Sequence, residues 1–106
     1  MLKGIGKRIV MTEKDYGLDL PIRIIGATFD ASDKIKMIIK DRTNGTTILE
    51  KEFGNITDNT INFNLTEEES LLFRPTNYVY SLDWYRNGEF LCNIVPNGAF
   101  EVGDKC

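Results

Sequence analysis

Short runs in which apolar and polar residues alternate are the feature that most limits what this chain can fold into. In the segment DKIKMIIKD (33–41), three apolar residues alternate with three lysines. Successive side chains of a strand point to opposite faces, so this pattern is typical of a strand with one buried and one wet face. Comparable runs, each bounded by turn residues, occur at 6–12, 18–26, 47–53, 61–65, 77–86, 89–95 and 99–102.

The turn residues between these runs indicate hairpins. Asn44-Gly45 and Asn87-Gly88 are the pairs that a type I′ turn prefers, because both of its central residues need positive φ. Pro96-Asn97-Gly98 predicts a further turn that separates the last two runs. Pro21 cannot donate a hydrogen bond to a neighbouring strand, so its run is expected at a sheet edge or a bulge.

One segment favours a helix. Thr66 is followed three residues later by Glu69, the spacing of a capping box. Residues 67–69 are all glutamate, and negative charge is favoured in the first turn of a helix. Adjacent helical residues point in different directions, so these acids do not converge on a catalytic or calcium site. We therefore expect a short helix near 67–73 that ends before Pro75.

About eight short strands with little helix predict an all-β fold, an antiparallel immunoglobulin-like β-sandwich. A chain of 106 residues is long enough for one domain with a real core. We divide it into an N-terminal arm or first strand (1–12) and a single sandwich domain (13–106).

The composition argues against most catalytic chemistry. The chain has no histidine, which removes Ser-His-Asp and Cys-His arrangements and most zinc sites. Asp30, Ser32 and Asp33 in FDASDK lack the spacing of a calcium loop and indicate a polar turn. We predict no catalytic residues, no metal and no cofactor. The net charge of −3 argues against a nucleic-acid partner.

The aromatic residues of 77–86 have two interpretations. Tyr78, Tyr80 and Trp84 fall on the same face of the predicted strand as Leu82, which favours a place in the core. Exposed rings of this kind could instead stack on sugars and make the chain a carbohydrate-binding module. Tyr85 falls on the opposite face, and it is our candidate contact residue in this run.

The N-terminus carries the remaining candidate contacts. Lys3, Lys7 and Arg8 form a basic cluster that could touch an acidic partner or be simply solvated. No signal peptide or transmembrane segment is expected in this stretch, so we predict synthesis in a cytoplasm and no membrane partner. Cys92 and the terminal Cys106 are not expected to form a structural disulfide, and no role is assigned to Cys106.

The order of these signals resembles a known group of domains. The matching positions are Leu65-Thr66, the acidic residues 67–69, the Tyr-x-Tyr of 78–80 and the Gly-x-Phe-x-Val of 98–102. They are similar to immunoglobulin-like domains of bacteriophage structural proteins, and most of all to the N-terminal domain of the phage baseplate upper protein family. The resemblance spans residues 18–102. It implies a non-enzymatic virion protein, made in the host bacterial cytoplasm, that binds other virion proteins and itself.

Several functions remain open at this point. The resemblance favours a baseplate or tail assembly subunit. A capsid decoration or head-fibre protein, a module that binds a host wall glycan, and an inhibitor of a host protein are the alternatives. For the assembly role we expect residues 1–12 to add a strand to a partner's sheet, so that their deletion weakens assembly and leaves the fold intact.

Overall fold

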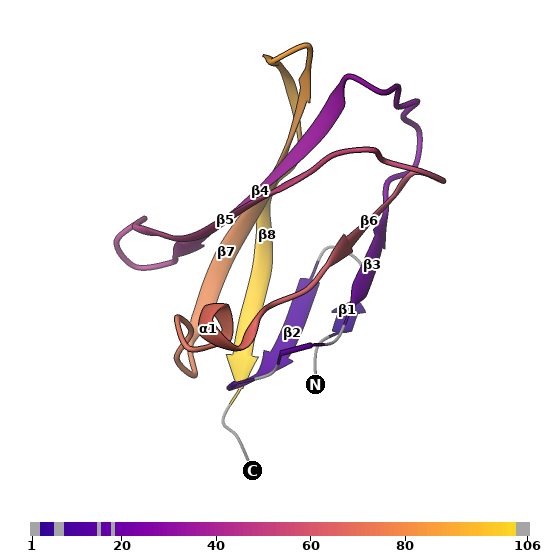
Figure 1. The fold of residues 1–106 in the computed structure, drawn as a ribbon. Helices are drawn as coiled ribbons and strands as arrows, with labels where there is room; N and C mark the ends of the chain where they lie inside the picture. Colours follow the sequence, from indigo (N-terminus) through magenta and orange to yellow (C-terminus); the bar gives the residue numbers. More distant parts are fainter. Residues whose placement is uncertain (1–2, 6–7, 15, 18, 104–106) are drawn as a thin grey trace.

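The computed structural model describes residues 3–5, 8–14, 16–17 and 19–103, and their fold is shown in Figure 1. The elements are β1 (Lys3–Ile5), β2 (Arg8–Thr12), β3 (Leu20–Arg23), β4 (Asp33–Asp41), β5 (Thr47–Phe53), β6 (Thr60–Phe63), α1 (Glu67–Ser70), β7 (Asn77–Arg86) and β8 (Glu89–Gly103). The prediction of an all-β fold with one short helix is confirmed.

The strands form two sheets. The larger has the order β1-β2-β8-β7-β4-β5, and the smaller consists of β3 and β6. All pairs of described strands are antiparallel except β2–β8, which runs parallel with Ile9 opposite Phe100 and Thr12 opposite Gly103. The prediction of a wholly antiparallel sandwich is wrong at this pair. A tight hairpin forces an antiparallel arrangement, but β2 and β8 are separated by most of the chain and no hairpin constrains them.

The last strand departs most from the sequence-based expectation. The predicted turn at residues 96–98 is absent, and β8 continues through it as one strand. The pairing of β7 with β8 shifts register instead, from Tyr80 opposite Gly98 to Leu82 opposite Val95. Pro96 lies in this irregularity, where a missing N–H breaks no ladder bond. Two further register shifts follow towards the hairpin, so β8 is a repeatedly bulged strand.

The two Asn-Gly pairs behave differently. Asn87 and Gly88 have φ of 53° and 80°, which confirms the predicted type I′ turn. At the other hairpin the prediction is wrong, because only Gly45 has positive φ (73°). There a longer loop is closed by the Asp41 N–H, which donates to the Thr46 carbonyl at 2.8 Å. The Asp41 carboxylate also accepts from the backbone N–H of residue 43 at 2.7 Å, which stabilises this loop without a type I′ turn.

The core lies between the two sheets. Phe63 of β6 meets Phe100 of β8 edge to face with ring centroids 6.0 Å apart, and Phe73 packs on Phe100 at 5.2 Å. Burial of each such ring contributes about 1.5–3 kcal/mol. The other buried apolar residues are Ile9, Met11, Ile24, Ile35, Met37, Ile39, Ile61, Leu65, Tyr78, Tyr80, Leu82, Val95 and Val102. Trp84 is half-buried and packs on Phe29, so the core interpretation of this aromatic run holds.

The acidic helix is held by its own cap. The Thr66 hydroxyl accepts from the Glu69 N–H at 3.1 Å, and the Glu69 carboxylate accepts from the Thr66 N–H at 2.9 Å. This is the predicted capping box. Lys51 of β5 reaches the same carboxylate at 2.9 Å, which ties the helix to the large sheet. Glu69 therefore has a structural role, and Glu67 and Glu68 lie beside it in the first turn of the helix.

The N-terminal segment is part of the large sheet. β1 pairs with β2, and β2 pairs with β8. Ile9 and Met11 of β2 are 2% and 1% exposed and belong to the core. A deletion of residues 1–12 would remove these side chains, which argues against our expectation that the fold survives it.

The position of Pro21 agrees with its chemistry. It lies in β3, opposite Asn62 of β6, in a sheet of two strands where β3 is an edge. The prediction of an edge strand is confirmed.

Candidate functional site

The outer face of the large sheet is the side away from the β3–β6 sheet. Near β5 its charges are paired: Lys34 contacts Glu52 at 3.1 Å and Lys36 contacts Glu50 at 3.2 Å. A hydrogen bond and the charge of Glu50 raise the pKa of Lys36. Exposed pairs of this kind contribute about 1 kcal/mol or less to folding stability. They orient these side chains but add little to the stability of the fold.

An apolar patch continues this face at the end of the β7–β8 hairpin. We call Tyr85, Phe90 and Leu91 the hairpin patch. Phe90 and Leu91 are 52% and 46% exposed, and Tyr85 is half-buried. The Tyr85 and Phe90 rings meet edge to face at 5.7 Å, and the Lys36 ammonium lies 5.0 Å from the centre of the Tyr85 ring. Tyr85, the predicted contact residue of this run, is thus part of an exposed cluster.

Sequence reasoning missed the other two members of the hairpin patch. It included residues 89–95 among the alternating runs and selected neither Phe90 nor Leu91. In the structure Tyr85 pairs with Phe90 while Trp84 pairs with Cys92, so Leu91 is the extra residue of a bulge. The sequence signal was the adjacent apolar pair Phe90-Leu91, since two neighbours in a strand cannot both face the core.

The basic N-terminal candidates are only partly described. Arg8 lies on the surface of β2 and forms a two-pronged ion pair with Glu101 of β8, in which its Nη2 donates to Oε1 at 3.0 Å. The hydrogen bond from Arg8 holds the pKa of Glu101 below its usual range. Lys3 lies in β1, where only the backbone is described, and Lys7 falls outside the described residues. The charge of Arg8 is therefore engaged within the sheet.

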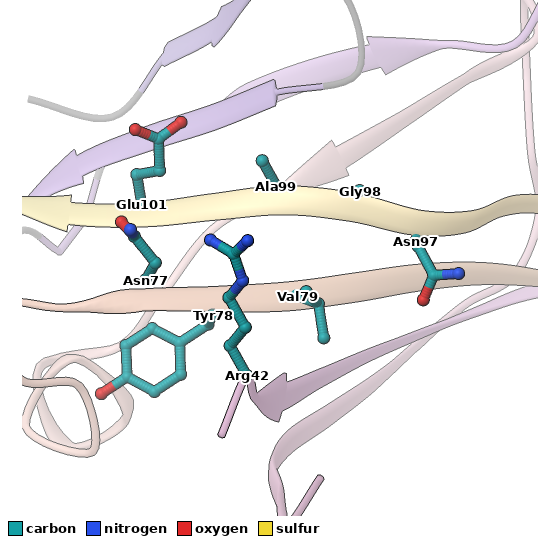
Figure 2. A pocket seen from close by; sticks show the side chains of 8 residues that line it. All are labelled: Arg42, Asn77, Tyr78, Val79, Asn97, Gly98, Ala99 and Glu101. Atoms are coloured by element: carbon teal, nitrogen blue, oxygen red, sulfur yellow. The ribbon is translucent and has the colours of Figure 1, made fainter. Parts of the chain in front are cut away.

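A shallow depression lies on the outer face over β7 and β8. Figure 2 shows its side chains, and its volume is about 430 Å³. Val79 and Ala99 form its apolar floor, Asn77, Asn97 and Glu101 surround it, and Arg42 extends over it from the β4–β5 loop. No local pattern indicates this site, because its residues come from three separate segments of the chain.

The FDASDK segment is a polar turn built around a buried carboxylate. Asp33 is 0% exposed and accepts from Arg86 Nε at 2.7 Å, Arg86 Nη2 at 2.9 Å and Trp84 Nε1 at 3.0 Å. The backbone N–H of Asp30 donates to the same carboxylate at 2.6 Å. The Arg86 hydrogen bonds, with smaller contributions from Asp30 and Trp84, hold the pKa of Asp33 far below its usual range. All of its oxygens thus have protein donors, as a structural role requires.

The described residues contain no group of three or more His, Cys, Asp or Glu side chains placed to hold a metal ion. Cys92 is exposed on β8. In the described part of the chain, no helix has the length and apolar character needed to cross a membrane.

Comparison of this chain with known protein families, with curated proteins and with solved structures finds no match.

Proposed function

We propose that this chain is a non-enzymatic structural protein of a bacteriophage virion, a baseplate or tail assembly subunit that works through protein–protein contacts. The observation that supports this best is the hairpin patch, an aromatic and aliphatic cluster exposed at one end of the sheet. The resemblance of residues 18–102 to phage structural domains supplies the context. The partners would be other virion proteins and further copies of this chain.

The hairpin patch has the composition of a contact site. Aromatic residues are enriched at protein interfaces, and a few buried anchors carry most of the binding energy. The type I′ turn and the pairing of Arg86 with Glu89 hold the hairpin that bears the patch. A rigid support of this kind lowers the entropic cost of binding, because little has to be ordered when the partner arrives. Figure 1 shows this hairpin projecting at the end of the molecule away from both labelled termini.

The test replaces the exposed pair with serine in the double variant Phe90→Ser/Leu91→Ser. The mass in solution is measured by light scattering coupled to size exclusion. We expect the wild-type chain to form a closed oligomer, such as a trimer or hexamer, and the variant to be a monomer. The matched control is Leu71→Ser/Leu72→Ser, since these leucines are 62% and 49% exposed and lie after α1. The control is expected to keep the oligomer.

An oligomer that persists in Phe90→Ser/Leu91→Ser would show that the hairpin patch is not the contact. A wild-type chain that is monomeric at every concentration would contradict self-assembly. Far-UV circular dichroism of both variants checks that the β fold is retained.

A further inference from the structure

The depression over β7 and β8 extends along the outer face of the large sheet. A smaller hollow of about 60 Å³ adjoins it, lined among others by Ile38, Lys40 and Ser81. Val79 and Asn97 line both spaces, so the two hollows adjoin and are treated together as the outer furrow. It crosses β4, β7 and β8 and carries two basic side chains, Arg42 beside the larger hollow and Lys40 beside the smaller one.

The charge of the outer furrow differs from that of its surroundings. Lys34 and Lys36 are neutralised by glutamates of β5, and Arg8 is neutralised by Glu101. Lys40 and Arg42 are exposed and make no ion pair with any described residue. Glu101 lines the same depression and interacts with the charge of Arg42, but its carboxylate is held by Arg8. With Lys40 and Arg42 added to that ion pair, positive charge exceeds negative charge around the outer furrow. This surplus favours an anionic ligand.

The polar groups beside these cations fit hydroxyl groups. Asn77 and Asn97 line the same depression as Arg42, and each amide offers two N–H donors and a carbonyl acceptor. A hydroxyl group both donates and accepts, so it pairs with an amide in either direction. The floor of Val79 and Ala99 is apolar and lies against the sheet, which suits the C–H face of a sugar ring. A ligand that carries both a negative charge and hydroxyl groups is an acidic sugar.

The sheet itself argues against an extended peptide at this position. Val79 pairs with Lys40 on one side and with Ala99 on the other, so the β7 backbone is already used by both neighbours. A peptide strand binds most readily where a sheet edge has free backbone groups. A ligand in the outer furrow therefore has to be recognised by side chains.

We propose that the outer furrow binds a sugar that carries a carboxylate, a uronic acid unit of an acidic glycan. The carboxylate pairs with the Arg42 guanidinium, whose planar fork matches two carboxylate oxygens. Hydroxyl groups of the same ring bind Asn77 and Asn97. Lys40, which lines the smaller hollow, meets the carboxylate of a neighbouring unit. This site is separate from the hairpin patch and does not depend on the proposed assembly role.

The experiment titrates the ¹⁵N-labelled full chain with trigalacturonic acid and follows the amide signals by NMR. We expect shifts at residues 40–42, 77–79 and 97–101. Arg42→Gln removes the charge from an exposed loop residue, and the affinity should fall by about tenfold to hundredfold, the range for a lost charge-assisted hydrogen bond. Asn77→Asp puts a like charge beside the carboxylate and should weaken binding as well. The matched control is Arg23→Gln, on the exposed part of β3, which should leave the affinity unchanged.

Two further ligands test which groups of the sugar are recognised. Maltotriose is neutral and should bind more weakly than trigalacturonic acid. Acetate should shift the same amides with lower affinity, since it lacks the hydroxyl groups. The proposal is overturned if trigalacturonic acid causes no shifts at these residues, if Arg42→Gln binds as the wild type does, or if acetate binds as tightly as the sugar. Dispersed amide spectra of each variant confirm folding.

Discussion

Gly98 illustrates how a single residue shapes this fold. It lies on β8 opposite Tyr80 of β7, and the Tyr80 ring covers it. A Cβ at this position would lie 2.3 Å from Tyr80 Cε1 and 2.4 Å from its Cζ. The φ of Gly98 is not in the left-handed region, so the glycine is needed for space and not for backbone conformation.

We predict that Gly98→Ala destabilises the protein by about 1–3 kcal/mol, because the added methyl group overpacks the core beside Tyr80. Urea unfolding followed by tryptophan fluorescence measures the change in the free energy of unfolding. Gly54→Ala is the control, since nothing lies within 4 Å of its added Cβ and its φ is also ordinary. Equal stability of the two variants would mean that the Tyr80 ring moves aside at little cost.

At the scale of elements, β2 has a larger role than a terminal segment usually has. It joins the large sheet in parallel with the end of β8 and contributes Ile9 and Met11 to the core. Beyond Phe100 towards the hairpin, no described strand pairs with the other edge of β8. The bulges and Pro96 in that stretch make its edge irregular, which disfavours uncontrolled pairing with other strands.

We predict that Met11→Ala lowers the free energy of unfolding by about 2–5 kcal/mol, the cost of emptying a core position. Deletion of residues 1–12 should leave a chain without a cooperative unfolding transition. Thermal melts followed by circular dichroism test both. Arg8→Ala, on the exposed side of the same strand, should melt near the wild-type temperature. A cooperative transition in the deletion variant would restore the view of residues 1–12 as a dispensable arm.

At the scale of the whole molecule, buried and paired carboxylates make stability depend on pH. Hydrogen bonds from Arg86 lower the pKa of Asp33, and the hydrogen bond from Arg8 lowers that of Glu101. Burial alone would raise the pKa of Glu69, but hydrogen bonds from Thr66 and Lys51 lower it overall. Each folded pKa thus lies below its unfolded value of about 4. Their stabilising contribution is complete above that value and is lost as the pH falls through and below it.

We predict that Asp33→Asn costs about 1–3 kcal/mol at pH 7, since an amide cannot accept from all four donors around Asp33. The difference from the wild type should shrink as the pH is lowered from about 7 to about 3, because the wild type then loses the contribution of this carboxylate. Urea unfolding across this range provides the measurement. Asp58→Asn, at an exposed carboxylate, serves as the control. A constant difference at all pH values would contradict the lowered pKa.

The sequence by itself determined the local elements of this protein. Alternation predicted strands at 33–41 and 47–53, which are the bounds of β4 and β5, and the spacing of Thr66 and Glu69 predicted the helix cap. These features depend on side chains a few residues apart. Their signals are therefore complete within a short window of sequence.

Only the tertiary structure decided the parallel pairing of β2 with β8, the register shifts that expose Phe90 and Leu91, and the position of Arg42 over β7 and β8. The physical reason is that each depends on contacts between segments distant in the chain. Alternation specifies which side chains face the core, but not which strand lies beside which or where a bulge accommodates the misfit. Both candidate contact sites arise at these places, because each joins residues that no local pattern connects.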